Sequence, residues 1–357
     1  VFFIQLTYVP SVSPGEQKTK PTQHATRLLQ SLGIQPNMII AREEEKLKKE
    51  AREKISLYCN VPMENVIDDP YVETLYELPL VFEKQGVYEI VAKYFGLRKE
   101  GDLEGWKKLV ENIKGTTKKA RIAIVGKYTD VKDAYLSVKE ALVHAGAWLR
   151  IRPDIKWVES TSIEEEGAKK HLSDVNGIIV PGGFGKRGIE GKISAINYAR
   201  TNKIPYLGLC LGMQLMVVEW ARNVLGWKDA NSTEFDKETK HPVIDILPEQ
   251  KQIARMGGTM RLGVYEMRIE KGTRAWEAYG QEVVYERHRH RYEVNPTLVE
   301  ELKKSGLVCS GWHKDIVEMV EWPESFGIAT QSHPEFKSRL EAPAPLFKIF
   351  LKEAGKA

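Results

Sequence analysis

The sequence has few cysteines, little net charge and no long hydrophobic run, and each absence argues against a class of protein. Its three cysteines, Cys59, Cys210 and Cys309, include no CxxC pair. They favour a reducing, cytoplasmic compartment over a disulfide-stapled secreted fold. Apolar runs such as 204–211 are far shorter than the ~20 residues that span a membrane. A net charge of +4 does not by itself indicate a nucleic-acid surface.

What remains is the composition of a globular chain of two or three domains. Hydrophobic residues make up 42% of the 357 positions and charged residues 29%, unlike a disordered chain. The sequence opens with VFFIQLTYVP and no initiator Met. We interpret residues 1–9 as a buried strand that Pro10 ends. A strand as the first element predicts a chain that begins inside a domain.

A change of pattern near residues 113–119 predicts two regions. This stretch, IKGTTKK, is polar, basic and contains a glycine, so we expect an exposed linker between domains at 1–112 and 120–357. After the linker, short apolar segments such as 121–128 alternate with helical periodicity. That alternation predicts an α/β fold with an open, mostly parallel sheet, joined by antiparallel strands within 261–294.

The sharpest motif is Gly208-Leu209-Cys210-Leu211-Gly212, between a predicted strand and helix. A G-x-nucleophile-x-G turn there is typical of a nucleophile elbow, in which the helix N-terminus favours the thiolate and the next N–H faces an oxyanion. A buried structural cysteine explains the pentapeptide equally well.

A cysteine nucleophile requires a base, and His333 in QSHPEF is the best candidate. Pro334 opposes a helix at this point, so we expect an extended segment in which Glu335 reaches the imidazole of His333 from the same side. A surface histidine beside an acidic residue is the alternative.

Three further segments are candidate anion or oxyanion sites. The turn at 180–185 (VPGGFG) brings backbone amides close to a ligand, and no Walker loop occurs in the chain. The run at 287–291 (RHRHR) places its three arginines on one face of a strand, suited to a carboxylate or phosphate. The segment at 18–24 (KTKPTQH) resembles an anion-binding loop. Solvated basic surfaces or a nucleic-acid patch remain alternatives for both runs.

Together, PGGFG, GLCLGMQ, NSTEF, GGTMRLG, ERHRHRYEVN and QSHPEF resemble the class I glutamine amidotransferase domain of the CTP synthase family. The upstream KTKPTQH, GIQPNMIIAR and CNVP resemble the C-terminal part of that family's synthetase domain, a P-loop-type α/β domain. The resemblance implies a flavodoxin-like amidotransferase sheet that follows a partial synthetase domain.

The resemblance also implies residue roles. The catalytic triad would be Cys210, His333 and Glu335. Glutamine and its oxyanion would be held by Gly183, Leu211, Gln214, Glu234 and Arg289. UTP, or CTP as inhibitor, would contact Lys18, Lys20, Gln23 and Lys54. The ATP adenine would lie near Arg42 and Val72, and the activator GTP near Phe184, Arg187 and Arg261.

The family's glycine-rich phosphate loop and Mg²⁺ carboxylates have no counterpart in this sequence, so the resemblance implies no metal ligand in this chain and a truncated synthetase domain. We therefore expect glutamine hydrolysis, with complete ATP-dependent amination of UTP in doubt. The family implies homotetramers and filaments. Another class I amidotransferase, a γ-glutamyl hydrolase, a nucleic-acid-binding module and an assembly fragment without catalysis are the alternatives.

Overall fold

The computed structural model describes residues 1–13, 15–98, 101–127, 132–246 and 260–356. The chain divides into two compact units, Val1–Lys114 and Gly115–Ala357, and each is described by itself. Tyr128 of the strand predicted over 121–128, and residues 257–259 of the GGTMRLG motif, lie outside the described residues.

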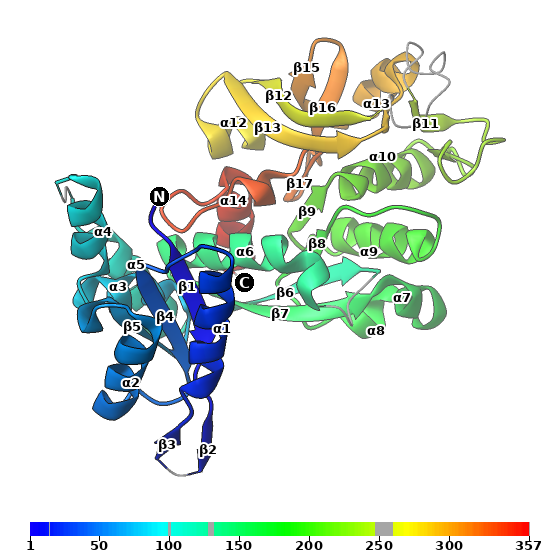
Figure 1. Ribbon diagram of the computed structural model, residues 1–357. Helices are drawn as coiled ribbons and strands as arrows, with labels where there is room; N and C mark the ends of the chain where they lie inside the picture. The colour runs from blue at the N-terminus through cyan, green and yellow to red at the C-terminus, as the bar shows by residue number, and fades with distance from the viewer. Residues whose placement is uncertain (14, 99–100, 128–131, 247–259, 357) are drawn as a thin grey trace. The chain divides into compact units, whose positions relative to one another are not determined.

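The first unit is built on a parallel sheet in the order β1-β4-β5 (Figure 1). Its strands are β1 (Ile4–Tyr8), β2 (Ser11–Ser13), β3 (Glu16–Gln17), β4 (Met38–Glu43) and β5 (Val66–Pro70). Its helices are α1 (Lys20–Ser31), α2 (Lys49–Cys59), α3 (Leu78–Lys84), α4 (Val87–Phe95) and α5 (Glu104–Gly115), with short 3-10 turns η1 (Met63–Asn65) and η2 (Leu75–Glu77). Apolar side chains of β4, such as Ile39, pack with Ile55 of α2 in its core.

The first strand is not buried on both faces, which corrects the prediction for residues 1–9. Within the described residues, β1 pairs with β4 alone, and Leu6 is 68% exposed. The opposite face holds a polar contact, in which the Thr26 hydroxyl of α1 donates to the buried Gln5 side chain at 2.8 Å. An apolar run predicts a strand, but it does not say how many of the strand's faces are covered.

The segment expected to be a linker is shorter than 113–119. Helix α5 continues through Gly115, with Ile113 half-buried, and strand β6 (Lys119–Gly126) begins four residues later. The apolar residues of an amphipathic helix are three or four positions apart, so the last turn of α5 is mostly polar and resembles a linker in composition.

The second unit contains a nine-stranded sheet in its described residues, in the order β13-β12-β15-β16-β17-β9-β8-β6-β7. The other strands are β7 (Arg152–Glu159), β8 (Gly177–Val180), β9 (Tyr206–Leu209), β12 (Arg261–Ile269), β13 (Val283–His290), β15 (Val308–His313), β16 (Ile316–Glu321) and β17 (Gly327–Thr330). A smaller sheet joins β10 (Asn231–Ser232), β11 (Pro242–Ile246) and β14 (Tyr292–Val294). Strands β17, β9, β8, β6 and β7 are parallel, whereas β12, β13, β15 and β16 are antiparallel, which confirms the predicted α/β fold.

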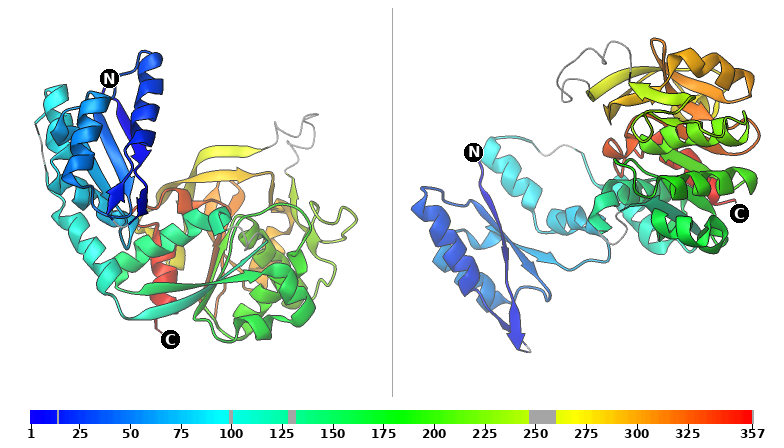
Figure 2. Two further views of the ribbon diagram at one scale, coloured as in Figure 1. Left: turned by 60° about the horizontal axis from the view of Figure 1, so that its bottom comes forward. Right: turned by 90° about the vertical axis from the view of Figure 1, so that its right-hand side faces the viewer.

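Helices cover both faces of the parallel strands, as Figures 1 and 2 show. The helical segments are η3 (Lys132–Tyr135), α6 (Leu136–Leu149), α7 (Ser160–Glu166), α8 (Ala168–Leu172), α9 (Ile189–Thr201), α10 (Leu211–Asn223), α12 (Arg274–Tyr279), η5 (Pro296–Leu298), α13 (Val299–Lys304), η6 (Pro334–Phe336) and α14 (Pro345–Ala354). One core packs residues of α9 and α10 against the sheet, and a second packs α6 and α14 against the other face. Buried parallel strands of this kind leave their carboxyl ends as the place for a site.

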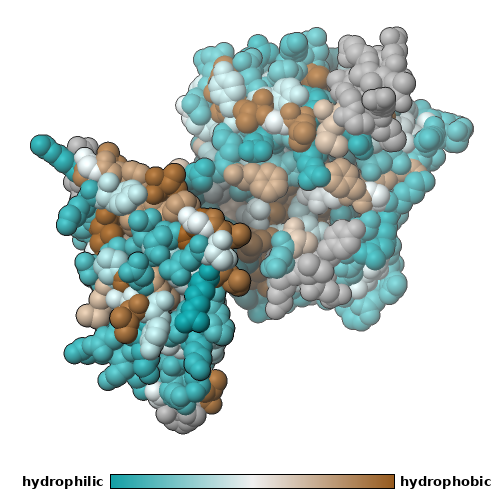
Figure 3. Space-filling model, in the orientation of Figure 1, coloured by the Kyte–Doolittle hydropathy of each residue, from teal (hydrophilic) through white to brown (hydrophobic). Residues whose placement is uncertain are grey.

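The antiparallel ribbon of β12 and β13 alternates between exposed residues and residues that are buried or half-buried. Along β13 every second side chain is buried, and Leu262, Val264 and Tyr285 are exposed on the ribbon. Figure 3 shows hydrophobic side chains at the surface where these two strands lie. The alternation places Arg287 and Arg289 outside, as predicted, and the intervening histidines inside.

Candidate active site

Cys210 occupies the turn between β9 and α10, and its own backbone conformation is strained. Its φ of 51° and ψ of −101° lie in a region that residues with a side chain rarely adopt. Its N–H donates to the Thr330 carbonyl at 2.7 Å, which ties the turn to the end of β17. The side chain therefore projects at the carboxyl edge of the parallel strands, as in a nucleophile elbow.

The flanking glycines are required by space. A Cβ on Gly212 would lie 2.1 Å from the Val180 carbonyl oxygen, and one on Gly208 would lie 2.8 Å from the Ala329 Cβ. Neither glycine has a positive φ, whereas Cys210 does. The glycines thus let β8, β9, β17 and α10 approach one another closely, and the strained conformation belongs to the cysteine itself.

His333 and Glu335 meet as predicted, but the local structure that joins them is different. The Nδ1 atom of His333 lies 2.7 Å from Glu335 Oε1. The segment is a turn of 3-10 helix, η6, with Pro334 at its first position, and not an extended strand. Proline is tolerated there because the first N–H of a helix has no intrahelical acceptor. The His333 N–H also donates to the Arg287 carbonyl of β13 at 2.7 Å.

The surroundings of His333 favour its charged form. Burial alone would lower the pKa of His333, but hydrogen bonds to Cys210 and Glu335 outweigh burial and raise that pKa to about 10. A protonated imidazole beside the sulfur favours a nucleophilic thiolate. The three side chains thus have the contacts of a nucleophile, a base and an orienting carboxylate.

Cys210 lies between two cavities. One is lined by Gly183, Leu211, Gln214 and Glu234 together with the segment His290, Arg291 and Tyr292. The other has a volume of about 290 Å³ and is lined by Arg289, His333, Phe184 and Gly182, among others. Cys210 therefore lines both a small pocket and a larger cavity.

The small pocket has groups of opposite charge. Burial raises the pKa of Glu234, which accepts a hydrogen bond from the Gly185 N–H at 3.3 Å, and the positive charge of Arg291 opposes that rise. Gln214 is buried and donates to the Tyr292 carbonyl at 2.9 Å. An α-amino group and an α-carboxylate require such a pair of charges.

Arg291 lines this pocket, and Arg289 does not. Arg289 lines the larger cavity with His333 instead. The family resemblance implied Arg289 as the glutamine contact, whereas the run by itself predicted all three of its arginines as candidates for a carboxylate. The difference arises because β13 ends at His290, so the strand alternation no longer decides where Arg291 points.

Two backbone amides suit an oxyanion. Leu211 begins α10, and the first N–H groups of a helix have no intrahelical acceptor. Gly183 follows β8 and lines both cavities beside Cys210. This placement agrees with the roles expected for both residues.

The three residues expected to contact GTP lie in two different environments. Phe184 is 53% exposed, its carbonyl accepts from Lys127 Nζ at 3.0 Å, and Arg187 donates to the Lys127 carbonyl at 2.7 Å. Arg261 is 7% exposed and its guanidinium bonds Glu318 at 2.6 Å and Glu293 at 3.0 Å. The side chain of Arg261, which the resemblance places near GTP, is therefore part of a buried ion network, and its contact to GTP stays a prediction.

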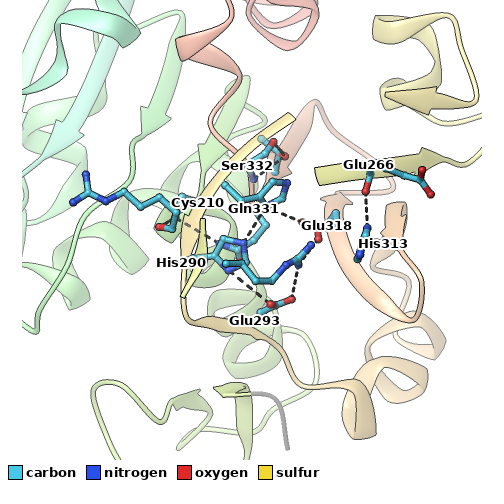
Figure 4. A network of polar contacts seen from close by, with 12 residues as sticks. Cys210, Glu266, His290, Glu293, His313, Glu318, Gln331 and Ser332 are labelled. Carbon is cyan, nitrogen blue, oxygen red and sulfur yellow. Dashed lines mark hydrogen bonds and ion pairs between the residues drawn. The ribbon is translucent and has the colours of Figure 1, made fainter. Parts of the chain in front are cut away.

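That network includes two buried histidines that sequence reasoning passed over (Figure 4). His288 Nδ1 and His290 Nε2 are 3.0 Å apart, and burial, with the nearby Arg261 charge, lowers the pKa of His288 to about 3. Within the described residues, atoms of His288, His290 and Glu318 approach within 4.8 Å of one another, as a metal site requires. The Arg261 guanidinium already neutralises the charge of Glu318, so we assign His288, His290 and Glu318 to this ion network and not to a metal site.

The residues expected at a UTP or CTP site lie on two neighbouring helices and the hairpin before them. They are Lys18, Lys20, Gln23 and Lys54. Lys18 bonds Glu16, and that hydrogen bond, aided by the charge of Lys54, lowers the pKa of Glu16. Gln23 is 8% exposed and donates to the Thr19 hydroxyl at 3.0 Å, and its contact to UTP or CTP stays a prediction.

Arg42 and Val72, expected near adenine, lie beside an exposed aromatic ring. Arg42 bonds Asp69 at 3.0 Å, and its guanidinium lies 4.2 Å from the ring centroid of Tyr71. Tyr71 is 57% exposed and precedes Val72. A flat ring and a planar cation at one place form a surface on which a base can stack.

Sequence reasoning also missed Lys192, a buried cation next to the glycine turn. Lys192 on α9 is 1% exposed, and its Nζ lies 3.5 Å from where a Cβ on Gly183 would be. Burial, with the charge of Lys127, lowers the pKa of Lys192 from 10.5 to about 8. A lysine inside a helical segment has no sequence signal that distinguishes it from a surface lysine.

We expect Lys192→Met to stabilise the second unit by about 3 kcal/mol at pH 7, since each unit of pKa change corresponds to about 1.4 kcal/mol. The folded state binds this proton less tightly than the unfolded state, so the charged lysine destabilises the fold fully below pH 8. The gain should shrink to nothing as pH rises to 10.5. Urea denaturation across this pH range measures the gain, with exposed Lys186→Met as control. Equal stability of Lys192→Met and wild type at pH 7 would contradict the prediction.

Comparison with known proteins assigns both units to a family. Residues 1–97 match the family "CTP synthase N-terminus" and residues 130–353 match "Glutamine amidotransferase class-I". The CTP synthase of Pyrococcus furiosus is 52% identical over 360 residues, which cover 99% of this chain and 67% of that protein. That of Thermococcus kodakarensis is 52% identical over 362 residues, covering 100% of this chain and 68% of the relative.

A solved structure supports the same family for the second unit. The glutaminase domain of the Trypanosoma brucei CTP synthase, with bound acivicin, is 44% identical and superposes with a TM-score of 0.63, covering 66% of this chain and 94% of that one. Among the described residues, no helix is long and apolar enough to span a membrane. On these matches, which extend over both units, the chain belongs to the CTP synthase family, glutamine-dependent ligases with a glutaminase domain.

Proposed function

We propose that Cys210, His333 and Glu335 hydrolyse glutamine to glutamate and ammonia in the second unit. The observation that supports this most directly is that His333 makes two contacts. Its imidazole hydrogen-bonds the sulfur of Cys210, and its Nδ1 atom lies 2.7 Å from Glu335 Oε1. They join the strained elbow to a base from a segment more than a hundred residues later in the chain.

The reaction then proceeds in two steps. The Cys210 thiolate attacks the carboxamide carbon of glutamine, and the N–H groups of Leu211 and Gly183 stabilise the oxyanion. The His333 imidazolium gives its proton to the departing nitrogen, and the C–N bond breaks to release ammonia. In the second step, His333 takes a proton from water, whose oxygen attacks the thioester carbon, and the C–S bond breaks to release glutamate and regenerate the Cys210 thiolate beside the His333 imidazolium.

The small pocket suits the amino acid head group of glutamine. We assign the α-amino group to Glu234 and the α-carboxylate to Arg291, with Gln214 fixing the orientation between them. This places the side-chain amide toward Cys210. The larger cavity on the other side of the sulfur leaves room for water to approach the thioester.

In the complete reaction of the family, the ammonia would displace phosphate from a UTP whose C4 oxygen ATP has phosphorylated. We propose Lys18, Lys20 and Lys54 as contacts to UTP or CTP, and Arg42 with Val72 as contacts to ATP. Phe184 and Arg187, beside Lys127, are proposed contacts of the activator GTP.

Mg²⁺, which the family implies with ATP, does not fit the buried acids of the first unit. Mg²⁺ prefers open carboxylate oxygens. The buried acids of this unit are Glu43, Asp68 and Asp69, and the last two bond Arg52 and Arg42. Glu43 accepts from the Leu47 N–H with one oxygen and leaves the other without a partner, but burial and the Asp68 charge raise its pKa to about 8, so that its carboxyl is mostly protonated at pH 7. We therefore assign no step to the metal.

Labelling with acivicin, an electrophilic glutamine analogue, tests the proposed glutaminase. We expect one equivalent to add covalently to Cys210, glutamine to slow the addition, and ammonia release to stop as labelling proceeds. Peptide mass spectrometry locates the adduct. Cys309→Ala should label like wild type, while Cys210→Ala should neither label nor release ammonia. Ammonia release that survives in Cys210→Ala would refute the assignment.

A further inference from the structure

Gln331 contacts the proposed nucleophile and has no role in the mechanism above. It directly follows β17 and is fully buried, and its backbone N–H donates to the Glu318 carbonyl at 2.8 Å. Its side-chain Nε2 lies 3.6 Å from Cys210 Sγ (Figure 4), within the distance of a hydrogen bond to sulfur. The end of β17 and the backbone of β16 thus hold the side-chain amide of Gln331 against the sulfur of Cys210.

The direction of this amide is determined by its neighbours. Gln214 Nε2 contacts both the Tyr292 carbonyl, at 2.9 Å, and Gln331 Oε1, at 3.3 Å. A backbone carbonyl only accepts hydrogen bonds, so Gln214 must present its NH₂ group there. That NH₂ group in turn requires the oxygen of Gln331 on its side. The NH₂ group of Gln331 therefore faces the sulfur.

The other neighbours of the sulfur explain what this donor does. The Arg289 carbonyl oxygen lies 4.0 Å from Cys210 Sγ, where it can accept from a thiol but repels a thiolate. His333 contacts the sulfur from a different segment and can donate to the thiolate only while protonated. Cys210 carries negative charge before it attacks glutamine and again when it leaves the thioester, and the Gln331 N–H is a donor whose hydrogen bond to that charge does not depend on the protonation of His333.

We propose that Gln331 is a catalytic residue that stabilises and aims the Cys210 thiolate through an N–H···S hydrogen bond. Gln214, which lines the small pocket, holds Gln331 in this orientation, so substrate in that pocket is linked to the sulfur by two consecutive amides. This inference rests on the proposed glutaminase function and adds a donor to it.

The test compares Gln331→Met, which keeps length and burial but has no donor, with Gln331→Glu, which keeps the shape and presents an oxygen to the sulfur. Ser332→Ala is the matched control, because Ser332 is buried in the same segment and bonds Thr330 and not the sulfur. The pH dependence of iodoacetamide alkylation at Cys210, read by peptide mass spectrometry, is measured for each protein together with kcat and KM for glutamine.

We expect Gln331→Met to lower kcat by about tenfold, with KM within about threefold of wild type, and to move the alkylation midpoint up by about one pH unit. Gln331→Glu should move the midpoint further, and Ser332→Ala should match wild type. An unchanged midpoint in both Gln331 variants would overturn the proposal, even if kcat fell through a looser structure. Alkylation requires no glutamine, so a wild type that alkylates but releases no ammonia would refute the glutaminase and leave the test of Gln331 valid.

Discussion

Replacing His333 by Asn should lower kcat for glutamine hydrolysis by about a thousandfold or more, since a positioned acid–base group contributes up to about 10⁴-fold. The variant loses both the cation that favours the thiolate and the proton that the departing ammonia requires. Ammonia release in a coupled assay measures the loss. His171→Asn is a suitable control, because that histidine pairs with Glu166. Retention of a tenth of the wild-type rate in His333→Asn would show that another base serves.

The same variant should also change stability with a defined sign. The pKa of His333 in the folded protein, about 10, exceeds the ordinary value of 6.5, so the folded state binds this proton more tightly. The resulting stabilisation is complete below pH 6.5 and is lost as pH rises through 10. His333→Asn should therefore cost more stability at pH 6 than at pH 10, as urea denaturation at the two pH values would show.

Gly182→Ala should lower kcat by about a hundredfold although it changes no chemical group. A Cβ at Gly182 would lie 2.8 Å from His333 Cε1 and 3.6 Å from the Cys210 Cβ. His333 is held by the Arg287 carbonyl and by Glu335, so it has little freedom to move aside. A displacement of about 1 Å in a catalytic group costs about 10²-fold.

The control for this variant is Gly105→Ala in α5, where an added Cβ meets no atom within 4 Å. It should keep the wild-type rate and thermal transition. Gly182→Ala should also remain folded, because Gly182 does not have a positive φ and alanine can adopt its backbone conformation. Normal turnover by folded Gly182→Ala would mean that His333 can occupy a second position, and that its present contacts with Cys210 and Glu335 are not those of the reacting enzyme.

The fold class and the meeting of Cys210, His333 and Glu335 could be predicted from the sequence because both depend on short-range patterns. Alternating strand and helix segments with glycine turns predict a parallel sheet, and the carboxyl ends of its strands meet at one edge. Cys210 directly follows β9, and His333 lies three residues after the end of β17. These two strands are neighbours in the sheet. Their meeting thus follows from topology.

Other features were decided by tertiary structure alone. Whether an apolar strand is covered on both faces depends on its neighbours, so the exposure of Leu6 on β1 had no local signal. Which cavity Arg289 and Arg291 line depends on where β13 ends, and Arg261 is held in a buried ion network because Glu293 and Glu318 arrive from other strands. Burial of Lys192 and the orientation of Gln331 likewise depend on residues distant in sequence, since desolvation and hydrogen-bond direction are properties of the packed core.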